Sequence, residues 1–158
     1  MASSYTDPGA WRIAMDATEA TLSMSTPGGR LTQELPRVSG SFFLRPSGAL
    51  AGFALRLLLP PHWDGPQVPS WEAADLDVDE QAWLRLGRHE VCRPVFVLCT
   101  RVPGEHSYTK IVLETSFSSW SLRLPGAAWH RPRPVTLRLF SEIRSVEDAP
   151  GSIHDRPR

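Results

Sequence analysis

The run from Ala49 to Leu59, ALAGFALRLLL, is the longest apolar stretch of the chain and decides its fold class. From Phe53 onward its residues alternate between two sides, with Phe53, Leu55, Leu57 and Leu59 on one and Ala54, Arg56 and Leu58 on the other. A period of two is typical of a β-strand with one buried face. The run is interrupted by Gly52 and Arg56 and is shorter than the roughly 20 apolar residues that a transmembrane helix needs. It therefore predicts a strand and no stable membrane insertion.

The same period of two recurs along the rest of the chain. Apolar and polar residues alternate at Trp11–Met15, Leu22–Met24, Ile111–Leu113 and Val135–Leu139. Several of these runs are separated by turn residues, namely Pro27-Gly28-Gly29, Pro46-Ser47-Gly48 and Pro103-Gly104. Short strands at this spacing predict an all-β protein built as an antiparallel sandwich or barrel.

One segment departs from this pattern. Asp77 and Glu80 have the spacing of a helix capping box, and Gly87 stands where a helix often ends, so we expect a short helix over about residues 78–86. The preceding stretch, Pro60 to Ala74, contains four prolines and two tryptophans. A loop of this length is often a lid or a binding loop. Whether it closes over anything is left open.

Length and charge restrict the class of protein. The 158 residues suit one domain with one core, which we assign to residues 1–147, followed by a flexible polar tail at residues 148–158. The 17 basic and 17 acidic residues balance, which argues against a nucleic-acid-binding protein. The opening residues, MASSYTDPG, lack the basic and apolar regions of an export signal, so a cytoplasmic location is expected.

The sequence contains no recognisable metal or cofactor motif. Cys92 and Cys99 are too far apart along one strand for a disulfide and do not form a zinc-binding pair, so we expect free thiols. None of the five histidines has metal-ligand spacing. There is no nucleophile elbow, phosphate loop or dinucleotide motif. We therefore expect neither a metal nor a cofactor.

Four blocks of sequence are similar, in order, to the motifs of one family. They are Trp11-Arg12-Ile13 with Leu22-Ser23-Met24, Val38 to Pro46, Trp83-Leu84-Arg85 with Arg93 to Thr100, and Ser121 to Gly126 with Arg133 to Leu137. Together they resemble the YceI-like proteins. The polar positions of those motifs differ here, with Ala14, Ala17, Arg45 and Pro125 in place of the family's acids and histidines. The resemblance therefore extends to the scaffold better than to any polar site.

The resemblance implies an eight-stranded, lipocalin-like antiparallel barrel around a long apolar cavity, in a family associated with isoprenoid lipids such as quinones. A barrel of about eight strands holds either packed side chains or one small ligand. Leu57, Leu58 and Leu59 in a row suit a wall that is apolar on both faces. The predicted inward residues are Ile13, Leu22, Met24, Phe42, Phe53, Leu55, Leu57, Val97, Leu113, Phe117, Leu122 and Leu137. They either line a cavity or fill the core.

The tryptophans form a second group of candidates. Trp63, Trp71, Trp83, Trp120 and Trp129 are expected in or beside loops or the helix. Of these, Trp63, Trp83 and Trp120 are predicted to contact a ligand, because large amphipathic rings at a barrel mouth stack on unsaturated chains or headgroups. They would equally serve as a plug that closes one end of the barrel.

Three functions remain open. The first is a module that binds a long hydrophobic molecule of isoprenoid or polyketide type. The second is a cofactor-independent cyclase of secondary metabolism that folds a polyene for ring closure, including pericyclic closure, with Tyr108, Glu114 and Arg138 as candidate polar groups. The third is an interaction protein with a filled barrel. The sequence does not distinguish a monomer from a homodimer.

One charged segment stands out beside these candidates. Between Arg123 and Arg144 there are five arginines and one acid. Arg131, Arg133 and Arg138 are candidates to face an anionic headgroup, because a guanidinium binds carboxylate and phosphate groups through two hydrogen bonds. The alternative is a solvated face.

Overall fold

A computed structural model describes residues 9–12, 17–61, 67–76, 78–105, 108–125 and 131–144. These residues form an all-β, antiparallel structure, as the sequence predicted. Its strands are β1 (Gly9–Arg12), β2 (Thr18–Thr26), β3 (Gly29–Glu34), β4 (Arg37–Leu44), β5 (Leu50–Leu58), β6 (Ser70–Ala73), β7 (Gln81–Leu86), β8 (His89–Pro94), β9 (Phe96–Val102), β10 (Tyr108–Ser118) and β11 (Pro134–Arg144).

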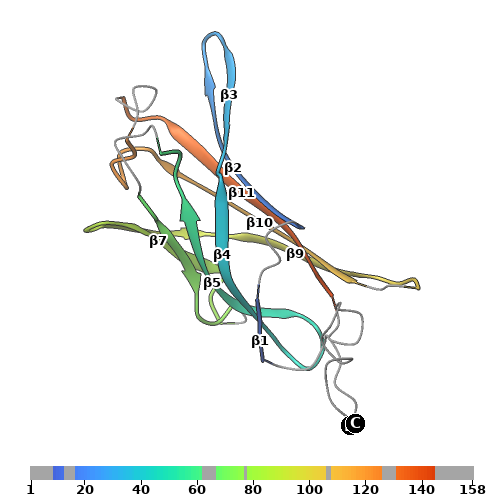
Figure 1. Ribbon diagram of the computed structural model, residues 1–158. Coiled ribbons are helices and arrows are strands. Elements are labelled where there is room, and N and C mark those ends of the chain that lie inside the picture. Colours follow the sequence, from blue (N-terminus) through green and yellow to red (C-terminus); the bar gives the residue numbers. More distant parts are fainter. Residues whose placement is uncertain are drawn as a thin grey trace.

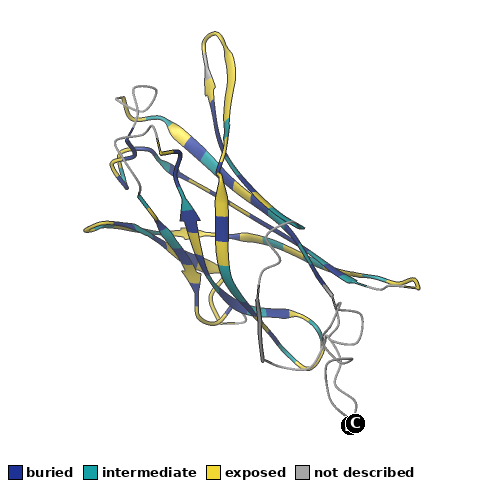
Figure 2. Ribbon diagram, viewed as in Figure 1, coloured by how far each residue is buried: buried dark blue, intermediate teal, exposed yellow. Residues whose placement is uncertain are grey.

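The strands are arranged in two sheets that face each other (Figure 1). One has six strands in the order β1-β4-β5-β6-β7-β8, and the other has five in the order β3-β2-β11-β10-β9. The apolar sides of β2, β4, β5, β6, β7, β10 and β11 lie between the sheets, where leucine, phenylalanine and valine side chains form one core. Figure 2 shows this as buried segments within the sheets, whereas the β2–β3 hairpin extends beyond the core and β3 is largely exposed.

The chain passes directly from one sheet to the other at two bends. At the first, Leu35 completes the β2–β3 pairing by donating its N–H to the carbonyl of Ala20, and Pro36 then leads into β4. At the second, Val95 completes the β7–β8 pairing by donating its N–H to the carbonyl of Glu80, and β9 follows in the other sheet. Bent strands of this kind form the corners of packed sheets.

The prediction of a closed eight-stranded barrel is wrong. Within the described residues there are eleven strands, and the hydrogen-bonded ladders form two separate sheets. The bends at Pro36 and Val95 explain part of the difference, because each divides one long extended run into two strands. At the first bend, Pro36 has no N–H to donate, so the ladder is interrupted there.

The prediction of a short helix over residues 78–86 is also wrong. Gln81–Leu86 is strand β7, and its Ala82, Leu84 and Leu86 are buried while Gln81 and Trp83 are exposed. Gly87 has a φ of 63° and forms the tight turn of the β7–β8 hairpin instead of a helix end. The capping signal produces only one turn, in which the carbonyl of Asp75 accepts the N–H groups of Val78 and Asp79.

The long loop expected over residues 60–74 is shorter in the structure. Ser70–Ala73 is strand β6, which pairs with both β5 and β7. The residues just before it continue the pairing, because the carbonyl of Pro69 accepts the N–H of Leu57 and the carbonyl of Gln67 accepts the N–H of Leu59. Residues 62–66 and the tail predicted at 148–158 lie outside the described residues.

The described residues contain no helix that is long and apolar enough to span a membrane.

Candidate functional site

The residues predicted to face inward lie in the core between the sheets. Their burial follows from the alternation along each strand, which turns every second side chain toward the opposite sheet. The buried ones are Leu22, Met24, Phe42, Phe53, Leu55, Leu57, Leu113, Phe117, Leu122 and Leu137. Val97 is half-buried and packs against this core. The side chain of Ile13 lies outside the described residues.

Between the sheets, side chains of the described residues form one hydrophobic core. Among the described residues, a small, partly open cavity lies between the sheets and has a volume of about 10 Å³. Its lining is entirely apolar, with Leu57 and Leu84 from the six-stranded sheet facing Leu137 and Phe117 from the other. Sites for small molecules usually have volumes of about 300–1,000 Å³. In this conformation the cavity is therefore far too small for a long ligand.

The segment Ser119–Pro125, which we call the cap, closes the end of the sandwich. Leu122 and Leu124 of the cap line the small cavity. The cap is anchored at Ser119, whose N–H donates to the carbonyl of Arg133 at 2.9 Å and whose hydroxyl donates to the carbonyl of Arg131 at 3.1 Å. Arg123 has a φ of 53°, a left-handed conformation that is unfavourable for a residue with a side chain. The cap is therefore a hydrogen-bonded turn segment with backbone strain at one residue, Arg123.

Trp71 is the unusual polar group of the interior. It lies on β6 with 0% of its surface exposed, and its ring packs edge-on against Phe53 with 5.3 Å between ring centroids. Among the described residues, no acceptor forms a hydrogen bond with its buried Nε1–H. An unsatisfied buried donor costs about 1–3 kcal/mol. A molecule entering the core with a carbonyl or ether oxygen would find one donor available to it.

Sequence reasoning placed Trp71 in a loop and did not select it as a site residue. A signal was present, since Ser70-Trp71-Glu72-Ala73 alternates polar and apolar residues. The run is only four residues long and follows four prolines, which concealed it. The tryptophans that were selected lie elsewhere: Trp83 and Trp120 are exposed, and Trp63 lies outside the described residues, as does Trp129.

The three candidate catalytic groups do not meet in the interior. Glu114 and Arg138 face each other across β10 and β11 on the outer face, where they form an exposed ion pair with 3.9 Å between Glu114 Oε1 and Arg138 Nε. Tyr108 begins β10 and is half-buried. No Asp, Glu, Lys, Arg or His is among the buried side chains of the described residues. The part of the interior that the structure describes thus supplies no ionisable acid or base of these types to a bound molecule.

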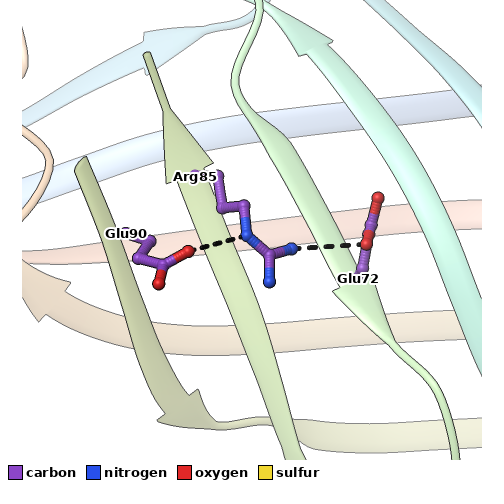
Figure 3. Close-up of polar contacts among 3 residues, drawn as sticks. All are labelled: Glu72, Arg85 and Glu90. Atoms are coloured by element: carbon purple, nitrogen blue, oxygen red, sulfur yellow. Dashed lines mark hydrogen bonds and ion pairs between the residues drawn. The ribbon is translucent and has the colours of Figure 1, made fainter. Parts of the chain in front are cut away.

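A cluster of three charged side chains lies on the outer face of the six-stranded sheet (Figure 3). Arg85 of β7 lies between Glu90 of β8, at 2.9 Å from Nε, and Glu72 of β6, at 3.4 Å from Nη1. The Arg85 guanidinium also lies over the ring of Trp83, at 5.2 Å from its centroid. All three charged side chains are substantially exposed. The cluster connects three strands and is separated from the core by the sheet itself.

Both cysteines are free thiols. Cys92 donates its S–H to Gln81 Oε1 at 3.2 Å, and Cys99 donates to the carbonyl of Gly48 at 3.6 Å. Burial raises the pKa of the Cys99 thiol, which a backbone hydrogen bond from Leu50 partly opposes. In the described part of the chain, no three His, Cys, Asp or Glu side chains are grouped so as to hold a metal ion.

Comparison with known proteins does not assign this chain to a family. No protein-family model matches it, and no curated protein matches it. The resemblance to YceI-like proteins therefore stays a prediction.

Proposed function

We propose that this protein binds an elongated apolar molecule of isoprenoid or polyketide type between its two sheets, and that Trp71 donates a hydrogen bond to an oxygen of that molecule. The buried Nε1–H of Trp71, which has no acceptor among the described residues, carries this proposal. Its surroundings are apolar, so a ligand there would be recognised by burial of hydrocarbon and by one polar contact. The sequence resemblance supports the same class of ligand.

Binding requires the interior to open, because the cavity of about 10 Å³ holds no ligand. The cap is the element best suited to move. It contributes Leu122 and Leu124 to the core and contains the left-handed Arg123. Strain in a segment that covers an apolar cavity is consistent with a role in admitting a ligand.

The test is to measure whether ligands bind and whether they contact Trp71. Native mass spectrometry of the protein as purified, followed by solvent extraction, detects any molecule already bound. A long-chain ketone and the alkane of equal length are then added to protein with ¹⁵N-labelled tryptophan. The ketone is expected to shift the indole N–H signal of Trp71 downfield, and the alkane is not. The signal is identified by its loss in Trp71→Phe.

Absence of both a co-purifying molecule and any binding of added ketones and quinones would contradict the proposal. The second candidate would then be an interaction protein with a filled interior. It is favoured by the small cavity and by Phe96 and Leu98, which are exposed on β9 at the edge of the five-stranded sheet. Size-exclusion chromatography with light scattering would follow, since an exposed strand edge with apolar side chains is suited to pairing with another chain.

A further inference from the structure

An open groove lies at the corner where β8 of one sheet meets β10 of the other. It has a volume of about 460 Å³ and is lined by Arg93, Arg133 and the three serines Ser116, Ser118 and Ser121, with Phe117 among its apolar residues. The two arginines are far apart in the sequence and are brought together only by the packing of the sheets. No acidic side chain is among the described residues that line the groove.

The guanidinium groups of the two groove arginines carry N–H donors that suit an anionic ligand. Arg93 uses its Nε–H on the carbonyl of Ser116 at 2.8 Å, an arrangement that holds the guanidinium in the groove. Arg133 binds the cap through its backbone, since its N–H donates to Ser119 Oγ at 3.1 Å and its carbonyl accepts from the Ser119 N–H. Guanidinium groups bind carboxylate and phosphate oxygens in paired hydrogen bonds, and serine hydroxyls add further donors.

The groove adjoins the interior. Phe117 lines both the groove and the small apolar cavity, so its ring stands between them. Val91, also in the groove, is opposite Leu84 on β7, and Leu84 is opposite Trp71 on β6. These three residues form one row across the inner face of the sheet. Because neighbouring strands lie about 4.8 Å apart, Val91 and Trp71 are separated by about 10 Å.

We infer that the groove binds the anionic head of the ligand, a carboxylate or a phosphate, whose chain passes Phe117 and places an oxygen at Trp71, two strands away from the groove residue Val91. This inference rests on the proposed function. It narrows the ligand to an amphipathic molecule with an anionic end and a mid-chain oxygen. Of the arginines that the sequence grouped as one basic cluster, Arg133 lies in the groove, whereas Arg138 lies on the outer face beside Glu114. The inference therefore assigns head-group binding to Arg133 and not to Arg138.

The experiment uses a mid-chain oxo-octadecanoate and its methyl ester, which have the same chain but differ in charge. Binding is measured by calorimetry with wild-type protein, Arg93→Gln, Arg133→Gln and the control Arg138→Gln. The acid should bind roughly tenfold more tightly than the ester, because its carboxylate accepts charge-assisted hydrogen bonds that the ester cannot form as strongly. Each groove substitution should remove most of that advantage, leave the affinity for the ester unchanged and keep the Trp71 indole shift. Arg138→Gln should change nothing.

The outcomes separate this inference from the proposed function. If acid and ester bind equally and the arginine substitutions have no effect, the inference is overturned while the proposed function stands. If neither binds, both are overturned. Octadecyl phosphate and inorganic phosphate are tested as two further ligands. Tighter binding of octadecyl phosphate than of octadecanoate identifies the head as a phosphate. Binding of inorganic phosphate alone, with no binding of any long chain, contradicts the link to the interior. Arg133→Gln retains the backbone contacts with Ser119, so a folded variant is expected.

Discussion

The inner faces of the two sheets differ in whether their buried polar side chains have hydrogen-bond partners. On the five-stranded sheet, Thr115 Oγ1 donates to the carbonyl of Pro94 at 2.7 Å, and the fully buried Ser141 hydroxyl lies 2.7 Å from that of Thr18. On the six-stranded sheet, Trp71 Nε1 has no acceptor among the described residues. Polar groups that stabilise a core are normally paired. The difference therefore indicates that the threonine and serine contacts hold the fold together, whereas the indole N–H is available for something else.

The largest effect is expected at the centre of the six-stranded sheet. Trp71→Ala should lower the free energy of unfolding by about 3–5 kcal/mol, because it removes a fully buried ring and leaves a cavity. Trp71→Phe should cost much less, since it keeps an aromatic ring and removes the unsatisfied donor. Urea denaturation measures both. The control is Trp83→Ala, whose ring is 40% exposed on the outer face. A cost for Trp71→Phe close to that of Trp71→Ala would show that the N–H has a partner after all.

The substitution Thr115→Val tests the contribution of a paired polar group on the inner face of the five-stranded sheet. The substitution keeps the shape of the side chain but removes the donor to the Pro94 carbonyl, so we expect a loss of about 0.5–1.5 kcal/mol. Thr100→Val, at an exposed position of β9, is the matched control and should have little effect. An unchanged urea midpoint for Thr115→Val would remove the distinction between the two inner faces.

The outer face should contribute less than either inner face. Arg85→Gln breaks the ion pairs with Glu72 and Glu90, but all three side chains are 41% exposed or more. Exposed pairs contribute about 0–1 kcal/mol and are screened by salt. Thermal unfolding at low and high salt should show a small loss that shrinks as salt is added. A loss that is large and independent of salt would instead indicate that the stem of Arg85 has a packing role.

The smallest effect concerns Cys99, which faces inward from the edge strand β9. Burial raises the pKa of its thiol above the ordinary value of 9.0. The unfolded thiol therefore loses its proton at a lower pH than the folded one, and stability should fall as the pH rises past 9.0 and through the folded pKa. Cys99→Ala should remove this part of the decline. Urea denaturation of both proteins at neutral and alkaline pH gives the comparison, and parallel declines would contradict it.

The segment around residues 77–87 shows why local signals misled the prediction. The spacing of Asp77 and Glu80 and the position of Gly87 match the ends of a helix, but both also suit turns that flank a strand. Ala82, Leu84 and Leu86 were spaced two apart all along, and pairing with β6 and β8 buries all three. Pairing in the sheet buries every second residue of this segment, so sheet formation overrode the capping signal.

The sequence by itself determined the all-β class, several of the strands and part of the core, because alternation is a local property of the chain. Only the tertiary structure decided how the sheets are divided, how small the cavity lined by Leu57 and Leu137 is, and that Trp71 has a buried donor with no acceptor among the described residues. It also brought Arg93 and Arg133 into one groove. These features depend on the distance and angle between sheets, which no stretch of sequence records, because they result from packing many side chains at once.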